Sequence, residues 1–279
     1  MTGEAPEMRE VTPTRTAARY VGGKRLLARE IVKRIDATPH ALYGEAFVGM
    51  GGVFLRRRLI PPRETINDRA RDIANFFRVL QRHEAALLDL LKWTLTSRAE
   101  YDRLKALDPD GLTDLERAAR FLYLQRMGFG GKGRTFGVSP AGKTRGFLGP
   151  GDLFARGLRP ALEAIHARLS GVVIEGLDWR DFLARWDRPY ALFYLDPPYM
   201  GSERFYGPGL FPPSDHEALA DVLSSLKGRF ILTMCDTPEA RRVYGRFAVE
   251  TAGLSYSVGG GGTSKPAREL IVTGGGGAI

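Results

Sequence analysis

Apolar, strand-like runs alternate with stretches of helical periodicity from Arg19 onward. The helical spacing is clearest over 24–35, where apolar side chains recur at every fourth position, at Leu27, Ile31 and Ile35. This alternation predicts an α/β fold, in which crossover helices connect the strands of a parallel sheet. Strands are expected near residues 42–47, 65–66, 172–175, 190–195, 230–234 and 269–273.

Two further helices are expected inside this rhythm. One follows a glycine cluster and covers 53–59. The other follows Ser214, because Ser214 and Glu217 have the spacing of a capping box and Gly228 marks the end of the apolar helical pattern.

The middle of the chain has a different character. Between residues 71 and 169 no strand pattern is found, and helical stretches are interrupted by a glycine-rich stretch. We therefore expect residues 1–70 and 170–279 to form one α/β domain and residues 71–169 to be an insertion.

Composition and charge limit the classes of binding partner and the kinds of metal or disulfide site that the chain can have. The 279 residues include 41 Lys and Arg against 32 Asp and Glu, a formal net charge of +9 that favours a polyanion such as nucleic acid. A single cysteine, Cys235, excludes an intramolecular disulfide and a cysteine-built metal site, and we interpret it as a small core residue of a strand. The four histidines are far apart, so no metal site is expected. No signal peptide or membrane-spanning run is seen, which makes the cytoplasm the expected location.

The glycine cluster Gly49–Gly52 lies between an expected strand and an expected helix. Glycines there let a ligand approach the backbone, and Asp68 follows Gly49 at close to the roughly 20-residue offset of a ribose-binding acid in dinucleotide folds. The third glycine of the dinucleotide pattern is replaced by Phe54, which favours a ribose-bearing cofactor without a pyrophosphate. Taken alone, a tight turn without a ligand explains the glycines equally well.

The tetrapeptide Asp196-Pro197-Pro198-Tyr199 follows the most apolar strand, at the end where open α/β sheets bind ligands. The prolines fix the backbone and leave carbonyl groups as acceptors beside the Asp196 carboxylate and the Tyr199 ring. This set suits a planar heterocycle with an exocyclic amino group, whereas a rigid strand exit is the alternative. The Arg19–Lys24 segment is an ordinary glycine turn when taken alone, and with the other two motifs it has the position of a lid.

In this order the motifs resemble the Dam-like (alpha-group) adenine-specific DNA methyltransferases. That family has an aromatic-x-Gly-Gly-Lys segment, a Phe-x-Gly-x-Gly loop, a target-recognition insertion and then Asp-Pro-Pro-Tyr. This chain has them at Tyr20–Lys24, Phe47–Gly51, 71–169 and Asp196–Tyr199, so the resemblance spans roughly residues 19–273. It implies a Rossmann-like methyltransferase sheet, S-adenosylmethionine as cofactor and a helical insertion that recognises double-stranded DNA.

The resemblance also implies roles for single residues. Those implied to contact S-adenosylmethionine are Tyr20, Lys24, Asp68 and Asp196. Those implied to shape the pocket for its methionine part are Glu45, Phe47, Gly49 and Gly51. Asp178 occupies the place of an acid near the cofactor adenine, and Ala46 stands where the family commonly has proline, which affects loop stiffness. The catalytic set is Asp196, Pro197, Pro198 and Tyr199.

The expected reaction follows from the chemistry of adenine. Its amino nitrogen is a poor nucleophile and is paired inside a duplex, so the base must leave the stack. It is then expected to stack on Tyr199 while its amino group donates to the Asp196 carboxylate and the Pro197 carbonyl, which directs the nitrogen at the methyl group. Transfer would be direct, with no covalent enzyme intermediate.

A basic stretch at 126–145 holds no acid and is interleaved with glycines, which suits a loop that follows DNA phosphates. Its cations are Arg126, Lys132, Arg134, Lys143 and Arg145. For any one of these cations, a position in a solvated loop without DNA contact is the alternative.

The run Arg56–Arg58 is interpreted as a helix end with solvated charges. Among partners, a restriction endonuclease is possible, and no metal or membrane partner is expected.

Three other functions stay open at this point. An RNA adenine methyltransferase would use the same pocket chemistry. A DNA-binding protein with a vestigial cofactor pocket is opposed by the intact Lys24, Asp68, Asp196 and Tyr199. An NAD-dependent oxidoreductase is least favoured, because the third glycine is missing.

Overall fold

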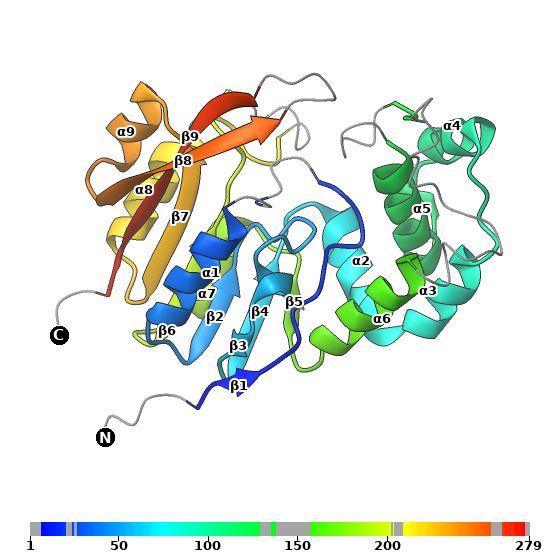
Figure 1. Cartoon of the computed structure of the whole chain (residues 1–279), viewed down its shortest axis with the longest axis horizontal. Coiled ribbons are helices and arrows are strands. Elements are labelled where there is room, and N and C mark those ends of the chain that lie inside the picture. The colour runs from blue at the N-terminus through cyan, green and yellow to red at the C-terminus, as the bar shows by residue number, and fades with distance from the viewer. Residues whose placement is uncertain are drawn as a thin grey trace.

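A seven-stranded sheet forms the centre of the molecule (Figure 1). The computed structural model describes residues 7–20, 24, 27–128, 135–137, 157–201, 203, 209–257 and 264–276, with the backbone alone at 254–257 and 264–267. The strand order is β5-β4-β2-β6-β7-β9-β8, and all neighbours as far as β7 are parallel. The strands are β2 (Leu42–Glu45), β4 (Arg63–Asn67), β5 (Val173–Glu175), β6 (Ala191–Leu195), β7 (Arg229–Cys235), β8 (Ala248–Ser257) and β9 (Ser264–Gly275).

This sheet confirms the expected mixed α/β class, with two additions at one edge. The final strands β9 and β8 run antiparallel, and β8 was not expected from the sequence. Cys235 is the last residue of β7 and is half-buried. The strands β4, β7 and β9 extend beyond the apolar runs that predicted them. The strand β8 has no continuous apolar run, which is why the sequence did not reveal it.

Both faces of the sheet are covered. Along β6, Leu192 and Tyr194 enter one core, whereas Phe193 and Leu195 enter the other, which explains why this strand is apolar throughout. The helix α1 (Ala28–Ala37) packs in the first core, in front of the sheet in Figure 1. The helices in the second core are α7 (Trp179–Trp186), α8 (Asp215–Ser224) and α9 (Pro238–Tyr244).

A group of helices lies beyond the β5 edge of the sheet (Figure 1). They are α2 (Arg71–Arg82), α3 (Glu84–Leu91), α4 (Arg98–Ala106), α5 (Asp114–Met127) and α6 (Arg159–Arg168), with a short 3₁₀ turn η2 at Pro109–Gly111. In the described part of 71–168 the sole β contact is an isolated bridge between Gly128 and Phe136. The buried residues of these helices belong to the same core cluster as those of α1. This core does not separate residues 71–169 from the sheet, and their division into an insertion stays a prediction.

Three details of the expected elements are wrong. The region 53–59 forms only the 3₁₀ turn η1 (Phe54–Arg56), followed by β3 (Leu59–Ile60), which pairs with β1 (Arg9–Glu10). Arg57 has extended torsions (φ −71°, ψ 138°), and the chain continues into β3, so the helical segment stays short.

The starts of two helices also differ. Helix α1 begins at Ala28 instead of residue 24. Ser214 has helical torsions (φ −62°, ψ −20°) and its side chain makes no cap bond, so the capping box is wrong. The cause is a turn in which the Asp215 N–H donates to the Pro212 carbonyl at 2.8 Å, so that Ser214 already lies inside the helical turn.

The Arg56–Arg58 run is not uniformly solvated either. Arg57 is fully buried and donates to Glu64, which also accepts two hydrogen bonds from Arg168 at 2.6 and 2.9 Å. The Arg57 guanidinium lies 3.6 Å from the centre of the Tyr43 ring. Two buried guanidinium groups therefore depend on one carboxylate.

We predict that Glu64→Gln lowers the free energy of unfolding by about 3–5 kcal/mol, because it leaves two buried cations without their counter-charge. Urea denaturation would measure the loss. The matched control is Glu10→Gln, which removes an exposed 3.8 Å pair with Arg58 and should cost below about 1 kcal/mol. Equal losses in the two variants would contradict this explanation of the cluster.

Candidate active site

A cavity of about 860 Å³ opens at the carboxyl ends of β2, β4 and β6. This is where the strand order of an open α/β sheet reverses and ligands bind. Its size lies within the usual range of small-molecule sites. The predicted site residues that line it are Tyr20, Lys24, Glu45, Phe47, Gly49, Asp68, Asp196 and Pro198.

The glycine loop after β2 depends on backbone torsions that only glycine adopts readily. Gly49 has φ +51° and Gly51 has φ +75°, both in the left-handed region. A Cβ atom on Gly49 would lie 3.1 Å from the Tyr20 ring, so that ring packs directly on the loop. Gly51 faces Leu55 instead and does not line the cavity, so it shapes the loop from behind.

Asp68 closes the glycine loop from the end of β4. Its two carboxylate oxygens accept backbone N–H groups of Gly49 and Ala70, each at 2.9 Å. Burial raises the pKa of Asp68 to about 6, and these two hydrogen bonds oppose the rise. The result is a fixed carboxyl group at the wall of the cavity, suited to hydroxyl donors.

Glu45 is the last residue of β2 and is buried. It accepts a hydrogen bond from the Tyr43 hydroxyl at 2.7 Å. Burial raises its pKa to about 8. At neutral pH the carboxyl group therefore keeps its proton and can donate as well as accept.

The other end of the cavity holds a network around the buried Lys24 ammonium. Lys24 Nζ lies 2.6 Å from Asp196 Oδ1, donates to the Tyr199 hydroxyl and lies 3.8 Å from Glu269 Oε2. Thr233 of β7 donates to the same Oδ1 atom of Asp196 at 3.1 Å. Burial raises the pKa of Asp196, and the Lys24 ammonium opposes that rise.

Two members of this network were missed by the sequence reasoning. Glu269 lies on β9 and Thr233 on β7, far from every motif along the chain. The one available signal for Glu269 was a carboxylate at the start of an otherwise apolar strand. Its place beside Asp196 depends on the antiparallel pairing of β9 with β7, which pattern reasoning did not predict.

The Asp-Pro-Pro-Tyr motif is only partly exposed to the cavity. Asp196 and Pro198 line it, whereas Pro197 is buried and the Tyr199 ring packs against the second core. The Tyr199 hydroxyl donates to Glu269 at 2.9 Å. Stacking of a base on Tyr199 stays a prediction.

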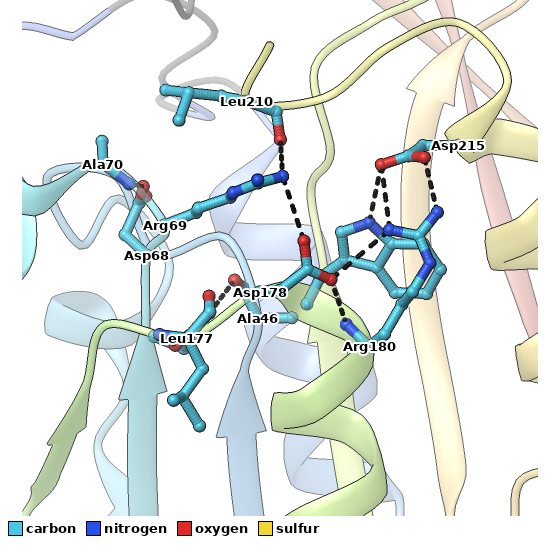
Figure 2. A network of polar contacts seen from close by, with 11 residues as sticks. Ala46, Asp68, Arg69, Ala70, Leu177, Asp178, Arg180, Leu210 and Asp215 are labelled. Atoms are coloured by element: carbon cyan, nitrogen blue, oxygen red, sulfur yellow. Dashed lines mark hydrogen bonds and ion pairs between the residues drawn. The ribbon is translucent and has the colours of Figure 1, made fainter.

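Asp178 lies at the start of α7, where its carboxylate accepts the Arg180 N–H at 3.0 Å. Figure 2 shows that Arg69 reaches across to Asp178 at 3.0 Å and to the Leu210 carbonyl at 3.1 Å. Arg69 and Leu210 line the cavity, but Asp178 does not. The carboxylate is therefore held behind an arginine in this structure.

Asn67 fixes the loop that carries Asp178. Its side-chain amide donates to the carbonyls of Ala46 and Leu177 at 3.0 and 3.1 Å, and its oxygen accepts the Leu177 N–H at 2.8 Å. One buried amide thus joins the ends of β2 and β4 to the segment before α7.

Of the predicted DNA-binding residues, Arg126 is placed on α5 and donates to the Ala17 carbonyl at 2.7 Å. It thereby supports the segment that lines the cavity. The others, Lys132, Arg134, Lys143 and Arg145, lie outside the described residues. The DNA-binding set stays a prediction.

Two features are absent from the residues that the structure describes. No helix in that part of the chain has the length and apolar character needed to cross a bilayer. Among the same residues, no group of three or more His, Cys, Asp or Glu side chains is placed to hold a metal ion.

The sequence model of the D12 class N6 adenine-specific DNA methyltransferases matches residues 20–257. The chain belongs to this family. It is also 25% identical over 274 residues to "Type II methyltransferase M1.LlaDCHI" of Lactococcus lactis subsp. cremoris, covering 93% of this chain and 95% of that protein. A solved precorrin 8w decarboxylase from Methanobacterium thermoautotrophicum is 14% identical to this chain, with a TM-score of 0.33 and coverage of 88% of this chain and 89% of that chain.

Membership confirms the resemblance expected from the motifs and the enzyme class. This D12-class methyltransferase acts on adenine in DNA, which decides against the oxidoreductase and the vestigial DNA-binding protein. The Rossmann-like architecture agrees with the seven-stranded sheet.

The buried Glu45 carboxyl generates a pH test. Its pKa in the folded protein is raised from 4.5 to about 8, so ionisation above about pH 5 favours the unfolded chain. We expect Glu45→Gln to become progressively more stable than the wild type between about pH 5 and about pH 8, by at most about 1.4 kcal/mol per pH unit. Urea denaturation across this range measures the difference, and a constant difference would contradict the buried, protonated carboxyl group.

Proposed function

We propose that this adenine-specific DNA methyltransferase takes its methyl group from S-adenosylmethionine, bound in the cavity between Asp68 and Asp196. The observation that carries the proposal is that one cavity joins both carboxylates. Asp68 supplies the acceptor for ribose hydroxyls at one end, and Asp196 supplies the acceptor for the target amino group at the other.

The residues present fit this cofactor. Asp68 is held rigidly by two backbone donors, as a carboxylate that binds a diol must be. Tyr20, Phe47 and the Gly49 loop provide apolar walls that let a ligand approach the backbone, while Glu45 and Lys24 provide polar groups. When bound, S-adenosylmethionine supplies an electrophilic methyl group.

Asp178 is proposed to bind the amino group of the cofactor adenine. In this structure Arg69 pairs with it and also holds the Leu210 carbonyl (Figure 2). The proposal therefore requires the Arg69 side chain to turn away from Asp178. Arg69 is more than one-third exposed, with 43% of its side chain accessible, so this rotation costs little packing.

Asp196 is proposed to receive the flipped target adenine. Its contacts with Lys24 and Thr233 both use Oδ1. Within the described residues neither uses Oδ2, so that oxygen can accept an amino hydrogen together with the Pro197 carbonyl. Acceptors held in this way draw the nitrogen lone pair out of the ring and stabilise the positive charge that develops on nitrogen.

Duplex DNA is the proposed substrate form. The net charge of +9 and the basic stretch at 126–145 favour binding of phosphates, and a base inside a duplex reaches such a site only by flipping. The Lactococcus relative is named as a type II methyltransferase. By this relationship we propose that the chain modifies one short DNA site, protects it from a cognate restriction endonuclease and works in the cytoplasm.

The decisive experiment uses labelled S-adenosylmethionine and unmethylated genomic DNA, followed by sequencing for methyladenine. We expect label at one short motif. Asp196→Asn should slow transfer by about 100-fold or more, because it removes the charged acceptor at the developing cation.

The matched control is Asp221→Asn on α8, an exposed acid paired with Arg246, which should keep wild-type activity. RNA of matched sequence should take no label. Label in RNA alone, or equal rates in the two variants, would contradict the proposal.

A further inference from the structure

Glu269 is a buried carboxylate in an unusual place. It lies on β9, is 3% exposed, and precedes the core residues Leu270, Ile271 and Val272. The antiparallel register sets Glu269 opposite Cys235, the last residue of β7. Its carboxylate therefore lies at the same end of the sheet as the cavity.

The side chain is joined to Asp196 through a continuous set of contacts. The Tyr199 hydroxyl donates to Glu269 Oε2 at 2.9 Å and accepts from Lys24 Nζ, which in turn lies 2.6 Å from Asp196 Oδ1. The hydroxyl thus has a donor on one side and an acceptor on the other. A phenol held in both roles has a fixed ring plane and a fixed hydroxyl direction.

The fold by itself gives little reason for a charge at this position. A buried carboxylate costs free energy, and a second one near Asp196 adds repulsion that the Lys24 ammonium must offset. Asp196 lies 2.6 Å from the Lys24 ammonium, so that cation keeps a close counter-charge without Glu269. The neighbouring residues of β9 already supply the apolar core.

We propose that Glu269 is a positioning residue for methyl transfer. It holds the Tyr199 hydroxyl and the Lys24 ammonium, and thereby keeps the Tyr199 ring and the Asp196 carboxylate in the orientation that the target base requires. The inference rests on the proposed function, because it takes Asp196 and Tyr199 as the residues that meet the base.

The test is a double-mutant cycle in the full-length protein. Glu269→Met keeps the side-chain volume but removes the acceptor, and Tyr199→Phe removes the hydroxyl but keeps the ring. The rate is measured in a single turnover at saturating DNA and S-adenosylmethionine, beside the thermal midpoint and the cofactor Kd.

We expect Glu269→Met to slow transfer by roughly tenfold or more, the scale of a lost hydrogen bond to a charged group. Its thermal midpoint and cofactor Kd should stay close to those of the wild type. The double variant should be no slower than the slower single variant, within about twofold. Glu269→Gln retains an acceptor and should recover most of the rate.

The outcomes separate this proposal from the function on which it rests. A wild-type rate in Glu269→Met beside an inactive Asp196→Asn overturns the role of Glu269 alone, whereas an inactive wild-type protein overturns the proposed function. Positioning through Tyr199 is also refuted if the double variant is slowed by the product of the two single fold-losses, or if Glu269→Gln is as slow as Glu269→Met. A Glu269→Met chain that fails to fold assigns Glu269 to stability and overturns the proposal.

Discussion

The buried ammonium of Lys24 is the interaction on which the site depends. It joins the segment before α1 to the end of β6 through Asp196, and it reaches Tyr199 and Glu269 as well. Because an unpaired charge in such a place is costly, each partner is held at a defined distance. The Tyr20 ring packs on the glycine loop, and Tyr20 and Lys24 both line the cavity.

The three carboxyl groups that line the cavity differ in the groups that contact them. Asp68 is stabilised by backbone donors, Asp196 by an ammonium and a hydroxyl, and Glu45 by a phenol. Burial raises the pKa of all three, to about 6 for Asp68 and about 8 for Glu45. One pocket therefore contains carboxyl groups of different protonation, each suited to a different part of cofactor or substrate.

The sequence predicted the parts of this arrangement that follow strand ends. The family resemblance implied that Glu45, Asp68 and Asp196 surround one cofactor, and all three line the cavity. The place of Glu269 in the site could not be predicted from the sequence, because it depends on the long-range antiparallel pairing of β9 with β7. Arg57 was misjudged for a related reason, since its counter-charge comes from β4 and lies in no local pattern.

One error was local. The capping box at Ser214 was wrong because a preceding turn had already placed that residue in the helix. The assignment of Asp178 to the cofactor came from its position in the chain and stays a prediction, whereas its ion pair with Arg69 became visible only in three dimensions (Figure 2). The order of the motifs thus located the site, whereas the residues that pair with its charged side chains were identified only from the structure.

A crystal structure of the protein with S-adenosylhomocysteine would show whether one cavity binds the cofactor between Asp68 and Asp196. We expect the ribose hydroxyls within hydrogen-bonding distance of the Asp68 carboxylate and the sulfur atom at the Asp196 end of the same cavity. A ligand bound elsewhere, or one whose ribose makes no contact with Asp68, would contradict it.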